Sequence, residues 1–100
     1  IFIVGNDLLA MGAIKALKES GLSIPEDISI IGFDNMPITN VMEPPLTTLD
    51  IYSKDLDILA VDSLLGMIYR EGTKNCCRKD VRGKLIVRES VKRIFPSRQL

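Results

Sequence analysis

Two polar residues in this chain stand shortly after apolar segments. Asn6 follows segment 1–4, and Asp34 follows segment 28–33. A carboxylate accepts hydrogen bonds through two oxygens, and an amide both donates and accepts. Such a pair can hold the hydroxyls of a sugar or the polar edge of a small metabolite. The same residues also have a structural interpretation, since Asn6 or Asp7 can cap a helix and Asp34 can end a strand with an Asx turn. The residue types alone leave both interpretations open.

Catalysis has little support in the residue types. The chain has no histidine, so the commonest base for activating a nucleophile is absent. Asp34 could act as a general acid or base, but no second acid is evident at a neighbouring strand end. The glycine spacing matches neither a dinucleotide site nor a phosphate-binding loop. We therefore expect no catalytic residue, no cofactor, and a protein that is not an enzyme.

The two cysteines, Cys76 and Cys77, are adjacent in the sequence. Adjacent cysteines rarely form a disulfide with each other because the required geometry strains the backbone. Without histidine they also lack the partners that would complete a zinc cluster. We expect reduced loop residues, no metal site, and a cytoplasmic location.

Length and charge place the chain among single soluble domains. It has 100 residues, 46% of them hydrophobic, and 13 basic residues against 13 acidic ones. No net charge therefore draws this segment onto nucleic acid or an anionic membrane. Its apolar runs are shorter than the roughly 18 residues of a membrane span, and "IFIVGND" lacks the basic flank of a signal peptide. Because Ile1 already lies in strand-like sequence, we expect the chain to be the later part of a longer protein.

The first third of the chain predicts a strand, a helix and a second strand. Segments 1–4 and 28–33 are continuous apolar runs, typical of parallel strands covered on both faces. Between them, apolar residues at helical spacing predict a helix over about 7–20. Such a βαβ unit makes the two strands parallel, so their carboxyl ends share one edge of the sheet. Asn6 and Asp34 should therefore emerge at the same edge, where open α/β sheets bind ligands.

The remainder of the chain predicts four further elements. Pro37 can open a short helical turn to about residue 41, and the β-branched content of 46–51 predicts a strand. A long helix is expected over about 53–71, with Ser53 as its N-cap and one apolar stripe along its length. Segment 84–90 reads as a last strand.

Four blocks of the sequence, in this order and spacing, resemble one known family. They are "GNDLLAMGAIKALKESGLSIPEDISIIGFDN", "PPLTT", the helix that follows it, and "LIVRES". Together they are similar to the effector-sensing core of the LacI/GalR family of bacterial transcriptional regulators, over about residues 1–95. The resemblance implies an α/β fold of the periplasmic-binding-protein-like type, in which helices flank Rossmann-like parallel sheets and an effector is clamped between two lobes. This chain would hold an incomplete part of that fold.

The resemblance also implies a division of the chain. Residues 1–95 would be the C-terminal portion of the effector-binding and dimerisation core, followed by a tail over 96–100. Within that portion, 1–52 and 81–90 would belong to the C-terminal lobe, and 53–80 would contribute to the N-terminal lobe. The DNA-binding domain of such a regulator would lie outside this chain, so operator DNA would be bound through a domain that is missing here.

Site residues follow from the resemblance position by position. Asn6 and Asp34 match residues that hydrogen-bond the effector from the C-terminal lobe, and Ile51 and Ser53 match positions that can line the pocket. The chain departs from the family pattern at Ile51, where glutamine is frequent, and at Tyr52, where proline is frequent. An apolar Ile51 loses a polar contact, which argues against a lactose-like effector.

The resemblance implies partners as well. The effector would be a small metabolite, such as a sugar or a related polar molecule, and the helix face bearing Met11 and the segment around Met42 would form a homodimer interface. Both methionines also suit a packed core. Effector binding would shift the population of lobe arrangements and so change DNA contact. No membrane partner is expected.

Two other functions use the same residues. A secreted sugar-binding protein of a transport system has a similar fold, but such proteins usually lack the "PPLTT" and "LIVRES" blocks. A helix-turn-helix upstream would favour the regulator, and a signal peptide there would favour the transporter. A dimerising scaffold with an incompetent cleft is the third hypothesis, and it should bind no ligand in any form.

Overall fold

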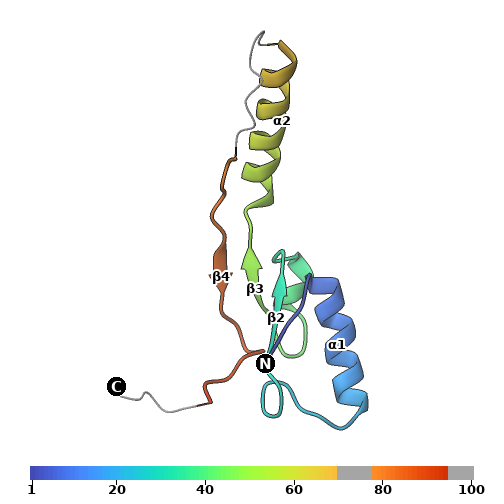
Figure 1. The fold of residues 1–100 in the computed structure, drawn as a ribbon. Coiled ribbons are helices and arrows are strands. Elements are labelled where there is room, and N and C mark those ends of the chain that lie inside the picture. Colours follow the sequence, from blue (N-terminus) through green and yellow to red (C-terminus); the bar gives the residue numbers. More distant parts are fainter. Residues whose placement is uncertain (70–77, 95–100) are drawn as a thin grey trace, which may run out of the picture.

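The computed structural model describes residues 1–69 and 78–94, and they form a four-stranded sheet with two long helices. Figure 1 shows their arrangement. The strands lie in the order β1-β2-β3-β4; β1, β2 and β3 are parallel, and β4 is antiparallel to β3. The elements are β1 (Phe2–Ile3), α1 (Asp7–Glu19), β2 (Ile30–Phe33), the 3-10 helix η1 (Pro37–Asn40), β3 (Thr47–Asp50), α2 (Ser53–Tyr69) and β4 (Lys84–Ile86). The α/β class expected from the sequence is confirmed.

The predicted βαβ unit is present as β1, α1 and β2. Asn6 caps α1, since its Oδ1 accepts a hydrogen bond from the backbone N–H of Leu9 over 2.8 Å. The helix ends at Glu19, and Gly21 follows with a φ of 83°, a left-handed conformation that glycine adopts without a Cβ penalty. The observed helix is thus within one residue of the predicted range.

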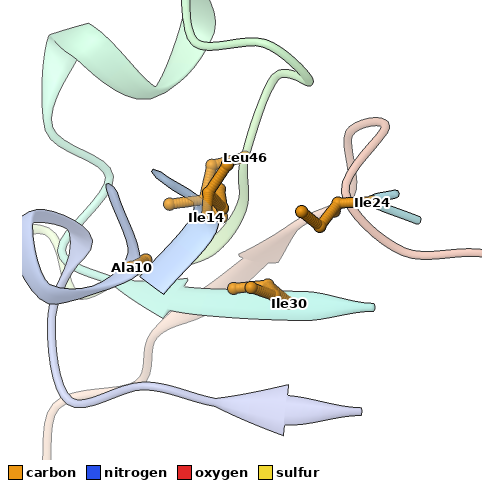
Figure 2. Close-up of a cluster of buried hydrophobic side chains, with 5 residues drawn as sticks. All are labelled: Ala10, Ile14, Ile24, Ile30 and Leu46. Carbon is orange, nitrogen blue, oxygen red and sulfur yellow. The ribbon is translucent and has the colours of Figure 1, made fainter. Parts of the chain in front are cut away.

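A small core lies between α1 and the sheet (Figure 2). It consists of five buried apolar side chains: Ala10, Ile14, Ile24, Ile30 and Leu46. Burying a side chain of the size of Ile30 or Leu46 contributes roughly 2 kcal/mol. The core therefore holds α1, β2 and the start of β3 together, and it fixes the elements that carry the polar residues.

Strand β1 differs from its prediction, because it is not covered on both faces. The side chains of Phe2 and Ile3 are 51% and 77% exposed. The reason is topological: β1 is the edge strand of the sheet, and no other segment of residues 1–69 and 78–94 pairs with its outer side. A continuous apolar run predicts a strand that needs covering, but it does not identify the covering segment.

The last strand is shorter than the predicted 84–90, because the residues after Ile86 bond differently. The hydroxyl of Ser90 accepts a hydrogen bond from the backbone N–H of Thr47 over 2.7 Å and donates to the carbonyl of Ile30 over 2.6 Å. The carbonyl of Ser90 accepts from the N–H of Ile30 over 2.9 Å. Ser90 is fully buried, and its hydrogen bonds to Ile30 and Thr47 connect β2 with β3. The "LIVRES" block therefore contributes a strand and a buried polar link.

Helix α2 leaves the sheet and projects away from it (Figure 1). None of its residues is buried, and the described chain measures 59 × 37 × 19 Å along its principal axes.

The prediction of Ser53 as N-cap of α2 is wrong, because the N–H groups of Asp55 and Leu56 already donate to the carbonyl of Tyr52. Ser53 is thus the first helical residue. In the described part of the chain, no helix is long and apolar enough to cross a membrane.

Several predictions concern residues that lie outside the described ranges. These are the end of the second helix at 70–71, the loop cysteines Cys76 and Cys77, and the tail over 96–100. The expectations for them stay predictions.

Candidate functional site

All four predicted ligand residues follow the carboxyl ends of adjacent parallel strands. Asn6 follows β1, Asp34 follows β2, and Ile51 and Ser53 follow β3. Because β1 pairs with β2 and β2 with β3 in parallel, these positions lie at one edge of the sheet. The prediction of a common edge is confirmed. Ile51 is half-buried there, and Ser53 is exposed.

Asp7 has a different position from the cap that the sequence allowed. It is the first residue of α1, and it is fully buried. Its Oδ1 accepts a hydrogen bond from the hydroxyl of Thr48, and its Oδ2 accepts one from the backbone N–H of Met36, both over 2.7 Å. Capping falls to Asn6 alone, whose side chain reaches the free amide of Leu9. Asp7 instead ties α1 to β3 and to the loop after β2.

Gly32 in β2 makes room for the Asp7 carboxylate. A Cβ placed on this glycine would lie 2.3 Å from Asp7 Oδ1 and 2.8 Å from Leu46 Cδ2. Both distances are far below van der Waals contact, so any other residue would displace the carboxylate or the core. The glycine of the "IIGF" segment therefore permits the close approach of α1 to β2.

Asp34 lies on a loop whose backbone is held at three consecutive amides. The N–H of Asp34 donates to the carbonyl of Leu49 over 2.9 Å, and the N–H of Asn35 donates to the hydroxyl of Thr48 over 3.2 Å. The third N–H, of Met36, donates to Asp7. Asp34 and Asn35 have positive φ values of 120° and 55°, conformations that persist only where surrounding contacts impose them.

The strand-ending alternative for Asp34 does not agree with these contacts. An Asx turn needs the Asp34 carboxylate to accept a hydrogen bond from the backbone N–H of Met36, two residues on. That N–H donates to Asp7 instead. The Asp34 side chain is exposed at the edge of the sheet. Its carboxylate is therefore directed to solvent on a fixed backbone.

Asn35 is the centre of a polar network beside Asp34. Its Nδ2 donates to Asp50 Oδ2 over 3.0 Å, and its Oδ1 accepts from Arg88 Nη2 over 2.8 Å. The other terminal nitrogen of Arg88 donates to the hydroxyl of Thr39 and to the carbonyl of Leu46, each over 2.8 Å. The "RES" block thus reaches the loop after β2 through one guanidinium group.

Asp50 ends β3 and uses both of its carboxylate oxygens. Oδ1 accepts from the backbone N–H of Tyr52 over 2.8 Å, while Oδ2 accepts from Asn35. The hydrogen bond from Tyr52 lowers the pKa of Asp50 most, followed by that from Asn35; nearby Lys84 also lowers it, while desolvation opposes these effects. Tyr52 has a φ of 49°, so the chain turns sharply between β3 and α2 at the residue that Asp50 holds.

The two methionines predicted at a dimer interface lie in different surroundings. Both are half-buried, but Met42 packs against the core cluster, whereas Met11 lies on α1 and is not among the side chains packed against it. The position of Met42 agrees with core packing, which the sequence also allowed. Their role in a homodimer stays a prediction.

Within residues 1–69 and 78–94, no three histidine, cysteine, aspartate or glutamate side chains gather as metal ligands would.

Several residues of this site were not identified from the sequence. They are the buried supports and the network around Asn35: Asp7, Asn35, Thr39, Thr48, Asp50 and Arg88. One signal was available, because Thr47 and Thr48 are consecutive polar residues in the strand predicted over 46–51, and the structure buries both of them. Buried hydroxyls need hydrogen-bond partners, so their presence indicated polar contacts from other segments.

Comparison with known proteins relates the chain to one family. The model of the periplasmic binding protein-like domain matches residues 2–91. The HTH-type transcriptional repressor PurR of Haemophilus influenzae (strain PittEE) is 45% identical over 92 residues, which cover 90% of this chain and 27% of that repressor. The chain therefore spans just over a quarter of the length of this curated relative.

Two solved structures are similar in fold and sequence. The lac repressor dimer bound to operator and the anti-inducer ONPF matches with a TM-score of 0.77 and 32% identity, over 89% of this chain and 30% of that chain. A LacI family transcriptional regulator from Enterococcus faecium with bound ribose matches with a TM-score of 0.74 and 35% identity, over 89% of this chain and 33% of that chain.

Proposed function

The chain belongs to the periplasmic-binding-protein-like family, with the effector-binding cores of LacI/GalR regulators as its relatives, and we propose that it is the effector-sensing part of such a regulator. The observation that carries the proposal is the shared edge of β1, β2 and β3, where Asn6 and Asp34 follow neighbouring strands. The proposed ligand is a small polar metabolite such as a sugar. The relative from Enterococcus faecium with bound ribose supports this class of ligand.

In the proposed site each residue has a separate role. The exposed Asp34 carboxylate accepts from ligand hydroxyls, and its fixed backbone limits the entropy lost on binding. Asn6 uses Oδ1 to cap α1, so its Nδ2 is the group we assign to the ligand. Ile51 and Ser53 line the same edge from the start of α2, with Ile51 offering an apolar contact.

We propose two lobes, with 1–52 and 81–90 in one and 53–80 contributing to the other. The bare surface of α2 supports this division. Leu64, Met67 and Ile68 are each more than half exposed, which is unfavourable for side chains of this size unless another segment covers them. Helix α2 starts at the edge of the sheet where Asn6 and Asp34 lie, and we call segment 51–53 the crossing point between the proposed lobes. A ligand held at that edge would contact residues on both sides of the crossing point.

The proposed mechanism is a shift between arrangements of the two lobes. A ligand stabilises the closed arrangement only by the difference between its affinities for the two states. In the intact protein, closure would change the contact of a separate domain with operator DNA. The lac repressor, a dimer bound to operator in its solved structure, supports both a homodimer and this DNA partner. A regulator of this kind is not an enzyme and works in the cytoplasm.

The decisive test is Asp34→Ala in the full-length protein. Titration calorimetry with ribose, lactose and a panel of related sugars first finds the ligand of the unsubstituted protein. Losing a charged acceptor should then weaken that ligand about 10- to 100-fold, because such hydrogen bonds contribute roughly 1.5–3 kcal/mol. The unfolding midpoint should stay nearly unchanged, since the side chain is exposed.

The matched control is Glu19→Ala, an exposed acid at the other end of α1. It removes one negative charge without touching the ligand edge, so the affinity should not change. Equal affinities for Asp34→Ala and the unsubstituted protein would contradict the assignment of Asp34. The absence of any response across the sugar panel would contradict the proposed class of ligand.

A further inference from the structure

A continuous chain of side-chain hydrogen bonds joins the loop that carries Asp34 to the start of α2. It runs from Arg88 to the Asn35 carbonyl oxygen, from the Asn35 amide nitrogen to Asp50, and from Asp50 to the backbone N–H of Tyr52. We call these three bonds the Asn35 clasp. They connect the segment after β4, the loop after β2, the end of β3 and the residue directly before α2.

The chemistry of the clasp gives Asn35 a role that few side chains could take. Its amide presents a donor to Asp50 and an acceptor to Arg88 at the same time. Asp50 needs both oxygens as acceptors, one for Asn35 and one for the N–H of Tyr52. Each of the three bonds thus pairs a donor with an acceptor, and the positive φ of Tyr52 is held through a charge-assisted bond.

We propose that Asn35 is a positioning residue, which holds Asp34 and the crossing segment 51–53 in one fixed relation. The inference rests on the proposed function for its consequence in ligand binding, because Asp34, Ile51 and Ser53 are the proposed contacts on the two sides of the crossing point. The mechanical part stands on the hydrogen bonds alone. Breaking the bond between Asn35 and Asp50 releases the carboxylate that holds Tyr52, 17 residues further along the chain.

The direction of each hydrogen bond allows a test by exchanging the two side chains. In Asp50→Asn, one amide oxygen replaces two carboxylate oxygens, so either Asn35 or the N–H of Tyr52 loses its acceptor. In Asn35→Asp, two carboxylates face each other and repel. In the double variant Asn35→Asp/Asp50→Asn, the new amide at 50 donates to the new carboxylate at 35 and still accepts from Tyr52. The donors and acceptors match again.

The experiment measures amide hydrogen exchange in the full-length protein and its single and double variants. We expect exchange of the Tyr52 N–H to become about tenfold faster in Asn35→Ala and in Asp50→Asn, and to return to within about threefold of the original rate in the double variant. Asn40→Ala is the matched control, since Asn40 is exposed at the end of η1. It should leave the Tyr52 rate unchanged.

Two outcomes would overturn the positioning role. One is an unchanged Tyr52 rate in Asn35→Ala, which would restrict Asn35 to its own loop. The other is a double variant that is folded by circular dichroism and yet exchanges as fast as the single variants. The consequence for binding is read separately by calorimetry with ribose as the probe, with about tenfold weaker binding expected in Asn35→Ala. If ribose binds neither the original protein nor any variant, the proposal of ribose as a ligand is contradicted. The exchange rates of the Tyr52 N–H still test whether Asn35 positions the crossing segment.

Discussion

Helices α1 and α2 use their apolar side chains differently. Helix α1 buries Ala10 and Ile14 against the sheet, whereas the longer α2 buries no residue. In α2, Leu64 and Met67 are 55% and 61% exposed. An apolar stripe at helical spacing therefore shows that a helix needs a partner surface, but it does not show which segment supplies that surface.

The two helices also begin differently. Helix α1 starts with a neutral cap from Asn6 and a buried acid, Asp7, that bonds to two other segments. Helix α2 starts after Tyr52, whose N–H is held by the charged Asp50, and its own first-turn acid, Asp55, is exposed. The first-turn acids of the two helices should therefore contribute differently to the free energy of unfolding, which substitutions can measure.

The largest expected difference is between Ile14→Ala and Leu64→Ala. In the 100-residue chain, Ile14→Ala should lower the free energy of unfolding by about 3 kcal/mol, because Ile14 is only 5% exposed and its loss leaves a cavity. Leu64→Ala should cost less than about 1 kcal/mol. Urea unfolding followed by circular dichroism measures both. Equal costs in this chain would mean that α2 has a packed partner within it.

A smaller difference is expected between Asp7→Ala and Asp55→Ala, which remove an acid from the first turn of each helix. Without Asp7, the hydroxyl of Thr48 and the N–H of Met36 lose their acceptor in a buried site, at a cost of about 2 kcal/mol. Asp55→Ala should cost no more than about 0.5 kcal/mol, the usual effect of an exposed charge on the helix dipole. Urea unfolding of the two variants measures both changes in the free energy of unfolding. A cost for Asp7→Ala as small as that of its partner variant would contradict the supporting role of Asp7.

The smallest expected effect is a dependence on pH at the start of α2. The pKa of Asp50 is lowered below its ordinary value of 3.8, first by the N–H of Tyr52 and then by Asn35. The stabilisation from these bonds is therefore complete above pH 3.8 and is lost as the pH falls through the lowered pKa. The cap of α1 has no such dependence, because the amide of Asn6 does not titrate.

An NMR titration of the Asp50 carboxyl carbon measures this effect. We expect a midpoint below 3.8 in the original protein and a partial rise in Asn35→Ala, in which the larger contribution from Tyr52 stays. Lys84→Ala serves as a comparison, since Lys84 contributes less than the two hydrogen bonds. A midpoint at or above 3.8 in the original protein would contradict the acceptor role of Asp50.

Most elements of the fold were predictable from local pattern. The range of α1, the turn at Pro37 and the strand around Thr47 follow from capping residues, proline and β-branched content, all of which act within a few residues. The parallel pairing of β1 with β2 follows from the short connection through α1. The exposure of β1 was not predictable, because the cover of an edge strand depends on which other segments are nearby.

The residues at the edge of the candidate site were predictable from the sequence, but the buried residues that hold them were not. The sequence indicated Asn6 and Asp34 as edge residues, and the parallel strands bring both to one edge. It did not separate Asn6 from Asp7 as the cap, since both residue types cap helices and the two are adjacent. Only the packing of α1 against Gly32 determines that Asp7 is the one buried.

What the sequence determined by itself is therefore the succession of elements and the edge at which the polar residues emerge. Periodicity, caps and turn residues are local properties, and they encode these features directly. Only the tertiary structure determined that Asn35 bonds to Asp50 and Arg88, and that Asp7 bonds to Thr48. These contacts join residues 15 to 53 positions apart in the chain, and such contacts depend on how the elements pack, which no local pattern specifies.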